Sequence, residues 1–190
     1  MTVSKSKHES LKIIVEESIN ELLKIHVENP HFFLKERERG VQCHLYAILS
    51  RKKFKNKKLG EAREPYKVSY LHPELPIKVS SKNSKPVDIT IGYPKEVEDK
   101  KGNKTEKWED CYMQIFREMY NIEIKKVTTA KLSKGIKYDI KKLCEIKKQF
   151  KGYVAMVVLS EKKASNPENK ELKKYARKHK VKLFVGVNKT

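Results

Sequence analysis

An uninterrupted apolar run near the C-terminus, YVAMVVLS at residues 153–160, is the feature that most restricts the fold of this chain. A strand that is apolar on both faces is typical of a sheet covered by helices on both sides. A helical segment is predicted at residues 166–180, and VKLFVGV at residues 181–187 is predicted to be a closing strand. Such a strand–helix–strand unit predicts a parallel pair joined by a right-handed crossover. The sequence therefore predicts an α/β protein.

Helices and short strands are predicted before this unit. Apolar residues at helical spacing predict amphipathic helices over residues 11–28 and 36–54. The order of elements becomes helix, three strands, helix, strand, helix, strand, which favours a mixed central sheet flanked by helices. We expect one domain overall, with an accessory helix at residues 1–30 and the α/β unit at residues 31–190. The other predicted elements are short strands at 66–72, 76–80 and 86–93, a hairpin tip or mobile loop at 94–110, a strand at 111–127, whose first half also fits a helix, and a helix at 134–150.

The charge of the chain is strongly positive. Its 190 residues include 44 Lys and Arg against 24 Asp and Glu, for a formal net charge of +20. Such an excess indicates a polyanionic partner, with nucleic acid favoured over an anionic membrane surface. The alternative is a lysine-rich, solvated surface of the kind that heat-adapted organisms use. We expect DNA as the partner and no membrane.

The cysteines and the N-terminus bear on the compartment. The three cysteines, Cys43, Cys111 and Cys144, are far apart and form no CxxC pair, so neither a zinc site nor a disulfide framework is indicated. The first ten residues, MTVSKSKHES, lack the apolar core of a signal peptide, and no run approaches membrane-spanning length. We therefore expect a reduced, cytoplasmic setting.

A charged pair interrupts an apolar strand at residues 121–127, NIEIKKV. Glu123 and Lys125 alternate with two isoleucines, so they share the opposite face of that strand. Many acidic residues precede a lysine by two positions in this chain, but Glu123 is the only one inside an apolar β alternation. Asp88 alternates with apolar residues in the same way in the preceding strand, PVDITIGY. If the two strands pair, Asp88 and Glu123 converge.

Two convergent carboxylates predict a cation. They repel each other, which raises the pKa of one of them unless a cation lies between them. A divalent metal that prefers oxygen ligands, Mg²⁺ or in its place Mn²⁺, removes this conflict. Lys125 would then act on a water at the metal or on negative charge that develops on a phosphate.

The residues Pro86, Asp88, Glu123 and Lys125 together resemble the motif of the PD-(D/E)xK nuclease superfamily, which has the restriction-endonuclease-like fold. The resemblance extends over residues 36–160 and implies an αβββαβ core, here with an extra C-terminal helix and strand. It also implies metal-dependent hydrolysis of DNA phosphodiester bonds. Pro86 is one residue further from the aspartate than in the literal signature. The long segment between Asp88 and Glu123 implies an insertion between the two strands.

Further residues follow from the same resemblance. Members often carry an additional Glu on the first core helix, where Glu38 fits and Glu36 competes with it. Many also carry a Gln one turn later, which Gln42 matches loosely. Asp110 would shorten the spacing to Glu123, but it lacks the apolar alternation. The resemblance therefore assigns catalysis to Asp88, Glu123, Lys125 and Glu38, and metal binding to Asp88, Glu123 and Glu38.

A basic segment, RKKFKNKKL at residues 51–59, follows the first core helix. In a nuclease it would contact phosphates near the cut. It could equally be a solvated loop, and the sequence leaves both interpretations open. The residues that would contact nucleic acid are Arg51, Lys52, Lys53, Lys55 and Lys57.

Three functions remain open at this point. The first is a Mg²⁺-dependent endodeoxyribonuclease of restriction or repair type. The second is a non-catalytic DNA- or RNA-binding domain that keeps the fold with an idle site, and the third is an RNA-associated basic protein of unrelated α/β fold. Taken singly, the residues have simpler interpretations: Asp88 in a turn, Glu123 and Lys125 as an exposed cross-strand pair, and Glu38 as a helix N-terminal residue.

A twofold homodimer is the simplest assembly for cutting both strands with one site per chain. The amphipathic helix at residues 7–28 is the expected contact surface. The alternative is that this helix covers the core of its own chain.

Overall fold

The computed structural model describes residues 3–29, 38–54, 56–61, 69–80, 83–98, 104–107, 116–150 and 152–188. Among these residues, no helix combines the length and the apolar character that crossing a bilayer requires. Lys55, Glu36, Asp110 and Cys111, which entered the sequence predictions, lie outside the described residues.

A mixed β-sheet forms the middle layer of the protein. In chain order its strands are β3 (Leu71–Ser80), β4 (Asn83–Glu98), β5 (Lys104–Lys107), β6 (Phe116–Thr129), β7 (Gly152–Lys162) and β8 (Lys182–Val187). They lie in the order β3-β4-β6-β7-β8, with β5 paired to β4 outside this path. The β3–β4 and β4–β6 pairs are antiparallel, whereas β6–β7 and β7–β8 are parallel. The predicted mixed α/β sheet is confirmed, including its parallel C-terminal pair.

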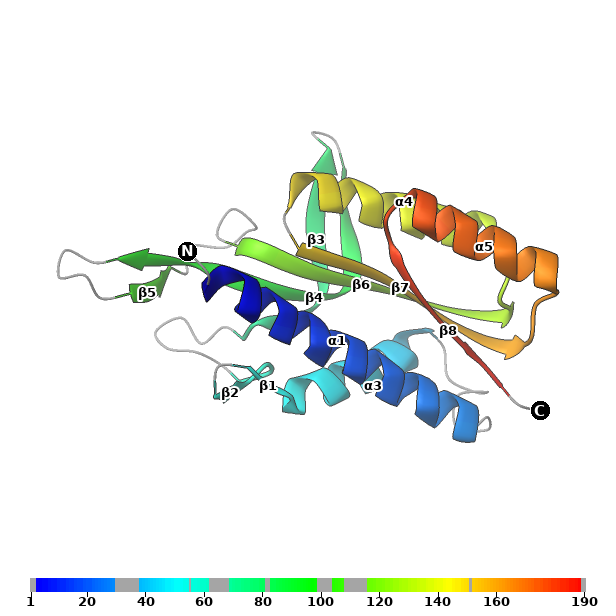
Figure 1. The fold of residues 1–190 in the computed structure, drawn as a ribbon, viewed down its shortest axis with the longest axis horizontal. Helices are drawn as coiled ribbons and strands as arrows, with labels where there is room; N and C mark the ends of the chain where they lie inside the picture. Colours follow the sequence, from blue (N-terminus) through cyan, green and yellow to red (C-terminus); the bar gives the residue numbers. More distant parts are fainter. Residues whose placement is uncertain are drawn as a thin grey trace.

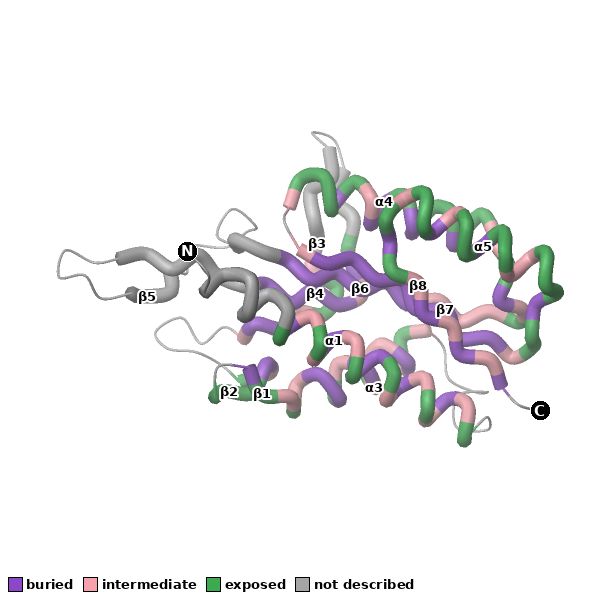
Figure 2. The backbone as a smooth tube through the Cα atoms, viewed as in Figure 1, coloured by how far each residue is buried: buried purple, intermediate pink, exposed green. Residues whose placement is uncertain are grey.

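Helices cover both faces of this sheet, as Figure 1 shows. On one face lie α1 (Val3–Glu28) and α3 (Glu38–Arg51), which pack against each other, and on the other lie α4 (Lys134–Gln149) and α5 (Asn166–Lys178). A small hairpin of β1 (Lys53–Phe54) and β2 (Lys57–Lys58) follows α3. Strand β7 is buried from residue 153 to residue 160, as its apolar sequence predicts, and Figure 2 shows the burial concentrated in the central strands.

Helix α1 covers the core of its own chain, the alternative that the sequence left open. Leu11, Val15, Ile19 and Leu22 are at most 2% exposed. They belong to the apolar core between this helix, α3 and the sheet. The apolar stripe that was considered for a dimer contact is therefore already used within the chain.

Helix α4 brings charged side chains to the sheet together with its apolar stripe. The hydroxyl oxygen of Ser133 accepts a hydrogen bond from the backbone N–H of Ile136 and so caps the first turn of α4. Ile136, Ile140, Leu143 and Ile146 are buried, as their spacing predicts. Asp139 and Lys142 are buried on the same helix.

The two short strands predicted at 66–72 and 76–80 are wrong as separate elements. From Leu71 onward they form one strand, β3, which runs through Pro73 and Pro76. Proline is tolerated there because β3 lies at an edge of the sheet, where an N–H can be missing without breaking a central ladder. Residues 66–68 lie outside the described residues. Of the two alternatives predicted for residues 94–110, a hairpin tip or a mobile loop, the structure shows the hairpin, since β4 pairs with β5 over Lys95–Glu98.

Candidate active site

Asp88 and Glu123 occupy adjacent positions on two antiparallel strands. Ile89 of β4 pairs with Ile122 of β6, so Asp88 and Glu123 are the next residues along these strands and share one face. Asp88 Oδ2 accepts a hydrogen bond from the backbone N–H of Ile124 at 2.6 Å. This bond fixes one carboxylate beside the other.

Burial and mutual repulsion perturb both carboxyl groups. Burial raises the pKa of Glu123 to about 8, and the neighbouring Asp88 carboxylate adds to the rise. Burial likewise raises the pKa of Asp88 to about 6, against the hydrogen bond from Ile124, which lowers it. Glu123 is only 3% exposed. The pair therefore holds a proton near neutral pH when only protein groups surround it.

Lys142 of α4 provides the nearest positive charge to Glu123. Its Nζ lies 2.6 Å from Glu123 Oε1 and donates a hydrogen bond to the carbonyl oxygen of Pro86 at 3.0 Å. Within the described part of the chain, Glu123 Oε1 nevertheless receives no aligned hydrogen bond. The Lys142 contact lowers the pKa of Glu123 but does not overcome the burial that raises it.

Lys125 is held between two further carboxylates. Its Nζ donates to Glu38 Oε1 at 3.1 Å and lies 3.3 Å from Asp139 Oδ2. Burial alone would lower the pKa of Lys125, but Asp139 and Glu38 outweigh burial and raise it. Glu38 comes from the first turn of α3 and Asp139 from α4, so elements on both sides of the sheet position one ammonium group.

The structure thus brings all four residues of the predicted catalytic set into one cluster and adds two more. Asp88 and Glu123 are electrostatically coupled, and Lys125 joins Glu38 to the same strand β6. The residues that sequence reasoning missed are Lys142 and Asp139. The sequence did contain a signal for these two residues. Both charges fall among the apolar positions of α4, so they lie on the face of the helix that is expected to be buried.

The charges of the cluster favour a divalent cation. When all groups are ionised, the four carboxylates of Glu38, Asp88, Glu123 and Asp139 exceed the two ammonium groups of Lys125 and Lys142 by two charges. Among the described residues, no three His, Cys, Asp or Glu side chains form a group that would hold a metal ion by themselves. Mg²⁺ does not require such a group, because it is commonly bound by one or two carboxylates and keeps several waters.

The basic segment lies at the far end of α3 from Glu38. The helix has 14 residues, so its two ends are about 20 Å apart. Arg51, Lys53 and Lys57 are exposed there. Lys52 instead pairs with Glu21 of α1, with 2.8 Å between Nζ and Oε2. Any phosphates bound by the exposed residues would therefore be several nucleotides from the cluster.

Comparison of this chain with protein-family models, with curated proteins and with solved structures gives no match. The assignment of a function therefore rests on the motif and on the geometry of the cluster.

Proposed function

We propose that this protein is a metal-dependent endonuclease of the PD-(D/E)xK superfamily that hydrolyses DNA phosphodiester bonds. The observation that carries the proposal is the coupled pair of the half-buried Asp88 and the buried Glu123, with the Lys125 ammonium group held nearby by Glu38 and Asp139. Buried acidic pairs with strongly raised pKa values are costly and are concentrated at functional sites.

The arrangement of the elements supports the same proposal. Apart from the β1–β2 hairpin and β5, helix α3 is followed by the antiparallel strands β3, β4 and β6, then by α4 and by β7, which runs parallel to β6. This order supports the αβββαβ core that the resemblance implies. The insertion expected between the two motif strands corresponds to the outer part of β4 and to β5.

The carboxylates suit a hard divalent cation, Mg²⁺ or Mn²⁺. Asp88 and Glu123 would hold it, because a positive charge between the two carboxylates offsets their repulsion and gives Glu123 Oε1 a partner. When bound, such a cation polarises the phosphate and lowers the pKa of a water at the site. Water and phosphate oxygens would complete its coordination.

The remaining residues act on charge and position. Lys125 keeps its proton because Asp139 and Glu38 raise its pKa, so it can stabilise negative charge that develops on the scissile phosphate. Glu38 and Asp139 fix the direction of the Lys125 side chain. Lys142 balances Glu123 until a cation arrives.

A non-catalytic nucleic-acid-binding domain is the second candidate, and one observation favours it. The Lys142 ammonium group already lies 2.6 Å from Glu123, in the place that a cation would take, as a protein group could in a site that no longer binds metal. The net charge of +20 is common to both candidates. Titration with Mg²⁺ separates them, because only the nuclease requires the cation.

The test is a cleavage assay on supercoiled plasmid, linear duplex and branched DNA, in Mg²⁺, in Mn²⁺ and in EDTA. We expect cleavage only with a cation. Asp88→Ala and Glu123→Ala should abolish both cation binding and cleavage. DNA binding should be retained or become stronger, because a negative charge that faces phosphate is removed.

Glu145→Ala is the matched control. Glu145 precedes Lys147 by two positions, as Glu123 precedes Lys125, but it is exposed on α4. Its replacement by Ala should therefore leave cleavage unchanged. Cleavage by the Asp88 and Glu123 variants at the rate of the unmodified protein would show that this site does not perform the reaction.

A further inference from the structure

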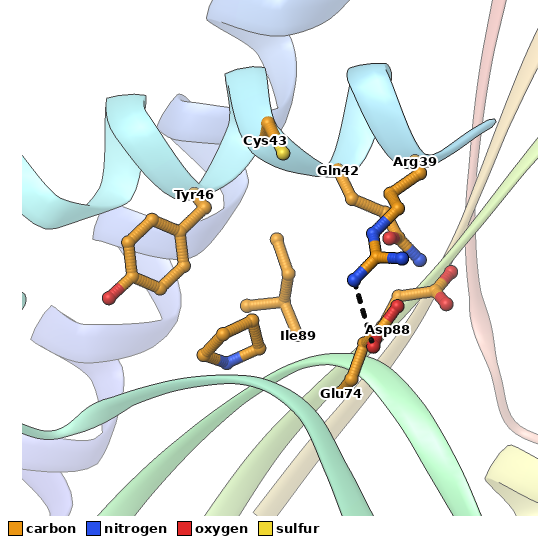
Figure 3. A pocket seen from close by; sticks show the side chains of 8 residues that line it. Arg39, Gln42, Cys43, Tyr46, Glu74, Asp88 and Ile89 are labelled. Carbon is orange, nitrogen blue, oxygen red and sulfur yellow. Dashed lines mark ion pairs between the residues drawn. The ribbon is translucent and has the colours of Figure 1, made fainter. Parts of the chain in front are cut away.

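A pocket of about 270 Å³ opens beside Asp88, between α3 and the strands β3 and β4 (Figure 3). Its volume lies just below the roughly 300–1,000 Å³ of sites for drug-sized ligands, so it has room for one small ring system. It is separate from the Lys125 and Lys142 contacts but shares Asp88 with the candidate active site. The residues that line it are Arg39, Gln42, Cys43, Tyr46, Pro73, Glu74, Asp88 and Ile89.

The pocket combines an apolar end with a polar end. Figure 3 shows the Tyr46 ring at one end, and Arg39 and Gln42 at the other, near Glu74 and Asp88. Proteins bind single nucleobases by stacking on aromatic rings and by hydrogen bonds to the base edges. Arg and Gln are side chains that pair with such edges. The lining therefore matches the face and the edge of one base.

The polar end also contains a strained residue. Glu74 has a backbone φ of 49°, in the left-handed region that a residue with a side chain seldom adopts. It lies between Pro73 and Leu75, which pair with Ile89 and Val87, so its position in the sheet is opposite Asp88. Strained backbone of this kind is concentrated at ligand sites.

An exchangeable ion pair spans the same end. Arg39 Nη2 lies 3.6 Å from Glu74 Oε2, and the two side chains are 79% and 48% exposed. A pair so exposed contributes little stability. Its donors and acceptors can therefore be redirected to a ligand at small cost.

We infer that this pocket receives one unpaired nucleobase of the nucleic acid that is cut at the neighbouring site, an inference that rests on the proposed function. A base inside a duplex is stacked on both faces and must be unpaired and extruded to enter such a pocket. The substrate is therefore DNA with an unpaired nucleotide beside the scissile bond, and a continuous duplex is a poorer substrate. Tyr46 stacks on the base, while Gln42 and Arg39 contact its edge.

The experiment measures binding of the full chain in EDTA, where no cleavage occurs, to three labelled DNA duplexes. One is fully paired, one carries a single unpaired adenine, and one carries an abasic nucleotide in place of that adenine. We expect the adenine duplex to bind about tenfold more tightly than the abasic one, the scale of a single base–aromatic contact. Adenine is chosen because Gln pairs with its edge.

Variants assign the effect to the pocket. Tyr46→Ala should remove the preference for the unpaired adenine, and Tyr46→Phe should keep it because the ring remains. Gln42→Ala, on a partly exposed side chain that does not endanger folding, should reduce the preference for the adenine duplex over the abasic one. Tyr138→Ala is the matched control, since Tyr138 is a 44% exposed tyrosine on α4 that does not line the pocket.

The outcomes separate this inference from the proposed function. Equal binding of the adenine and abasic duplexes, or a full preference in Tyr46→Ala, overturns the inference, while cation-dependent cleavage would still support a nuclease. A base preference without cleavage of any DNA supports the pocket as a nucleic-acid site and removes the nuclease. Absence of binding to all three duplexes overturns the inference, and the cleavage assay with Mg²⁺ then decides the proposed function.

Discussion

Replacing Glu123 with Gln should make the protein less sensitive to alkaline pH. Folding raises the pKa of this carboxyl from its ordinary 4.5 to about 8, so the folded chain binds a proton more tightly than the unfolded chain. The stability that this proton supplies is complete below pH 4.5 and is lost as the pH rises through 8. Gln copies the shape of the protonated form and does not titrate.

The size of the effect follows from the two pKa values. At 1.36 kcal/mol per pKa unit, the full difference corresponds to about 5 kcal/mol, and the part that falls between pH 5 and pH 9 is about 4 kcal/mol. We therefore expect the free energy of unfolding of the unmodified protein to fall by about 4 kcal/mol more than that of Glu123→Gln over this range. Titrating groups far from Glu123 are common to both chains and largely cancel in the comparison, whereas the coupled Asp88 and Lys142 contribute to the difference.

Urea unfolding in EDTA at pH 5, 7 and 9 measures this difference, with Glu145→Gln as the exposed control on α4. Adding Mg²⁺ at high pH should then favour the unmodified protein. At a concentration of 100 times its dissociation constant, a ligand that binds only the folded chain adds about 2.7 kcal/mol. Parallel pH profiles for Glu123→Gln and the unmodified protein would refute the claim that Glu123 is buried with a strongly raised pKa.

Four further predictions concern Lys142, the β1–β2 hairpin, α1 and the oligomeric state. Lys142→Met should tighten Mg²⁺ binding by about tenfold or more in calorimetry, because the Lys142 ammonium group repels the doubly charged Mg²⁺ more strongly than it repels the single proton that Mg²⁺ displaces from the carboxylates. Lys141→Met, at an exposed neighbouring position, should leave Mg²⁺ binding unchanged, and weaker binding in Lys142→Met would contradict the charge argument. Charge reversal at Lys53 and Lys57 should flatten the salt dependence of DNA binding by about 0.9 per lost phosphate contact, and an unchanged slope would exclude the β1–β2 hairpin from the interface. Removal of residues 1–30 should unfold the chain, since four buried aliphatic side chains at about 1.5–3 kcal/mol each approach the whole stability of a typical domain; a cooperative urea transition in the truncated chain would show otherwise. Sedimentation of the full chain, with and without DNA, then tests the expected homodimer, and a monomer at all concentrations would argue for nicking or for a branched substrate.

Much of the fold follows from the sequence because its central elements are locally unambiguous. The apolar run at 153–160 and the helical spacing around Ile140 each favour one structure, and both are confirmed. The strand β3 was divided wrongly because Pro73 and Pro76 resemble breaks when only local signals are considered. Whether a proline can be tolerated depends on the position of the strand in the sheet, which is a tertiary property.

The candidate site was accessible from the sequence only in part. The alternation around Glu123 and Asp88 identifies strand positions, and these positions suffice to suggest a pair. Lys142 and Asp139 were missed, because their contacts depend on how α4 packs against β6. The ion pair between Lys52 and Glu21 was not predicted either, because the two residues are 31 positions apart and no local pattern indicates the contact.

The rate of plasmid cleavage by Lys125→Ala, measured together with its Mg²⁺ affinity, tests the central claim most directly. Lys125 contacts Glu38 and Asp139 and is not proposed to hold the cation. The variant should therefore retain Mg²⁺ binding and lose cleavage by roughly 10²–10³ or more, the scale of removing one preorganised charge at a transition state. Cleavage by Lys125→Ala at the rate of the unmodified protein, with Mg²⁺ still bound, would contradict the assignment of this cluster as a nuclease active site.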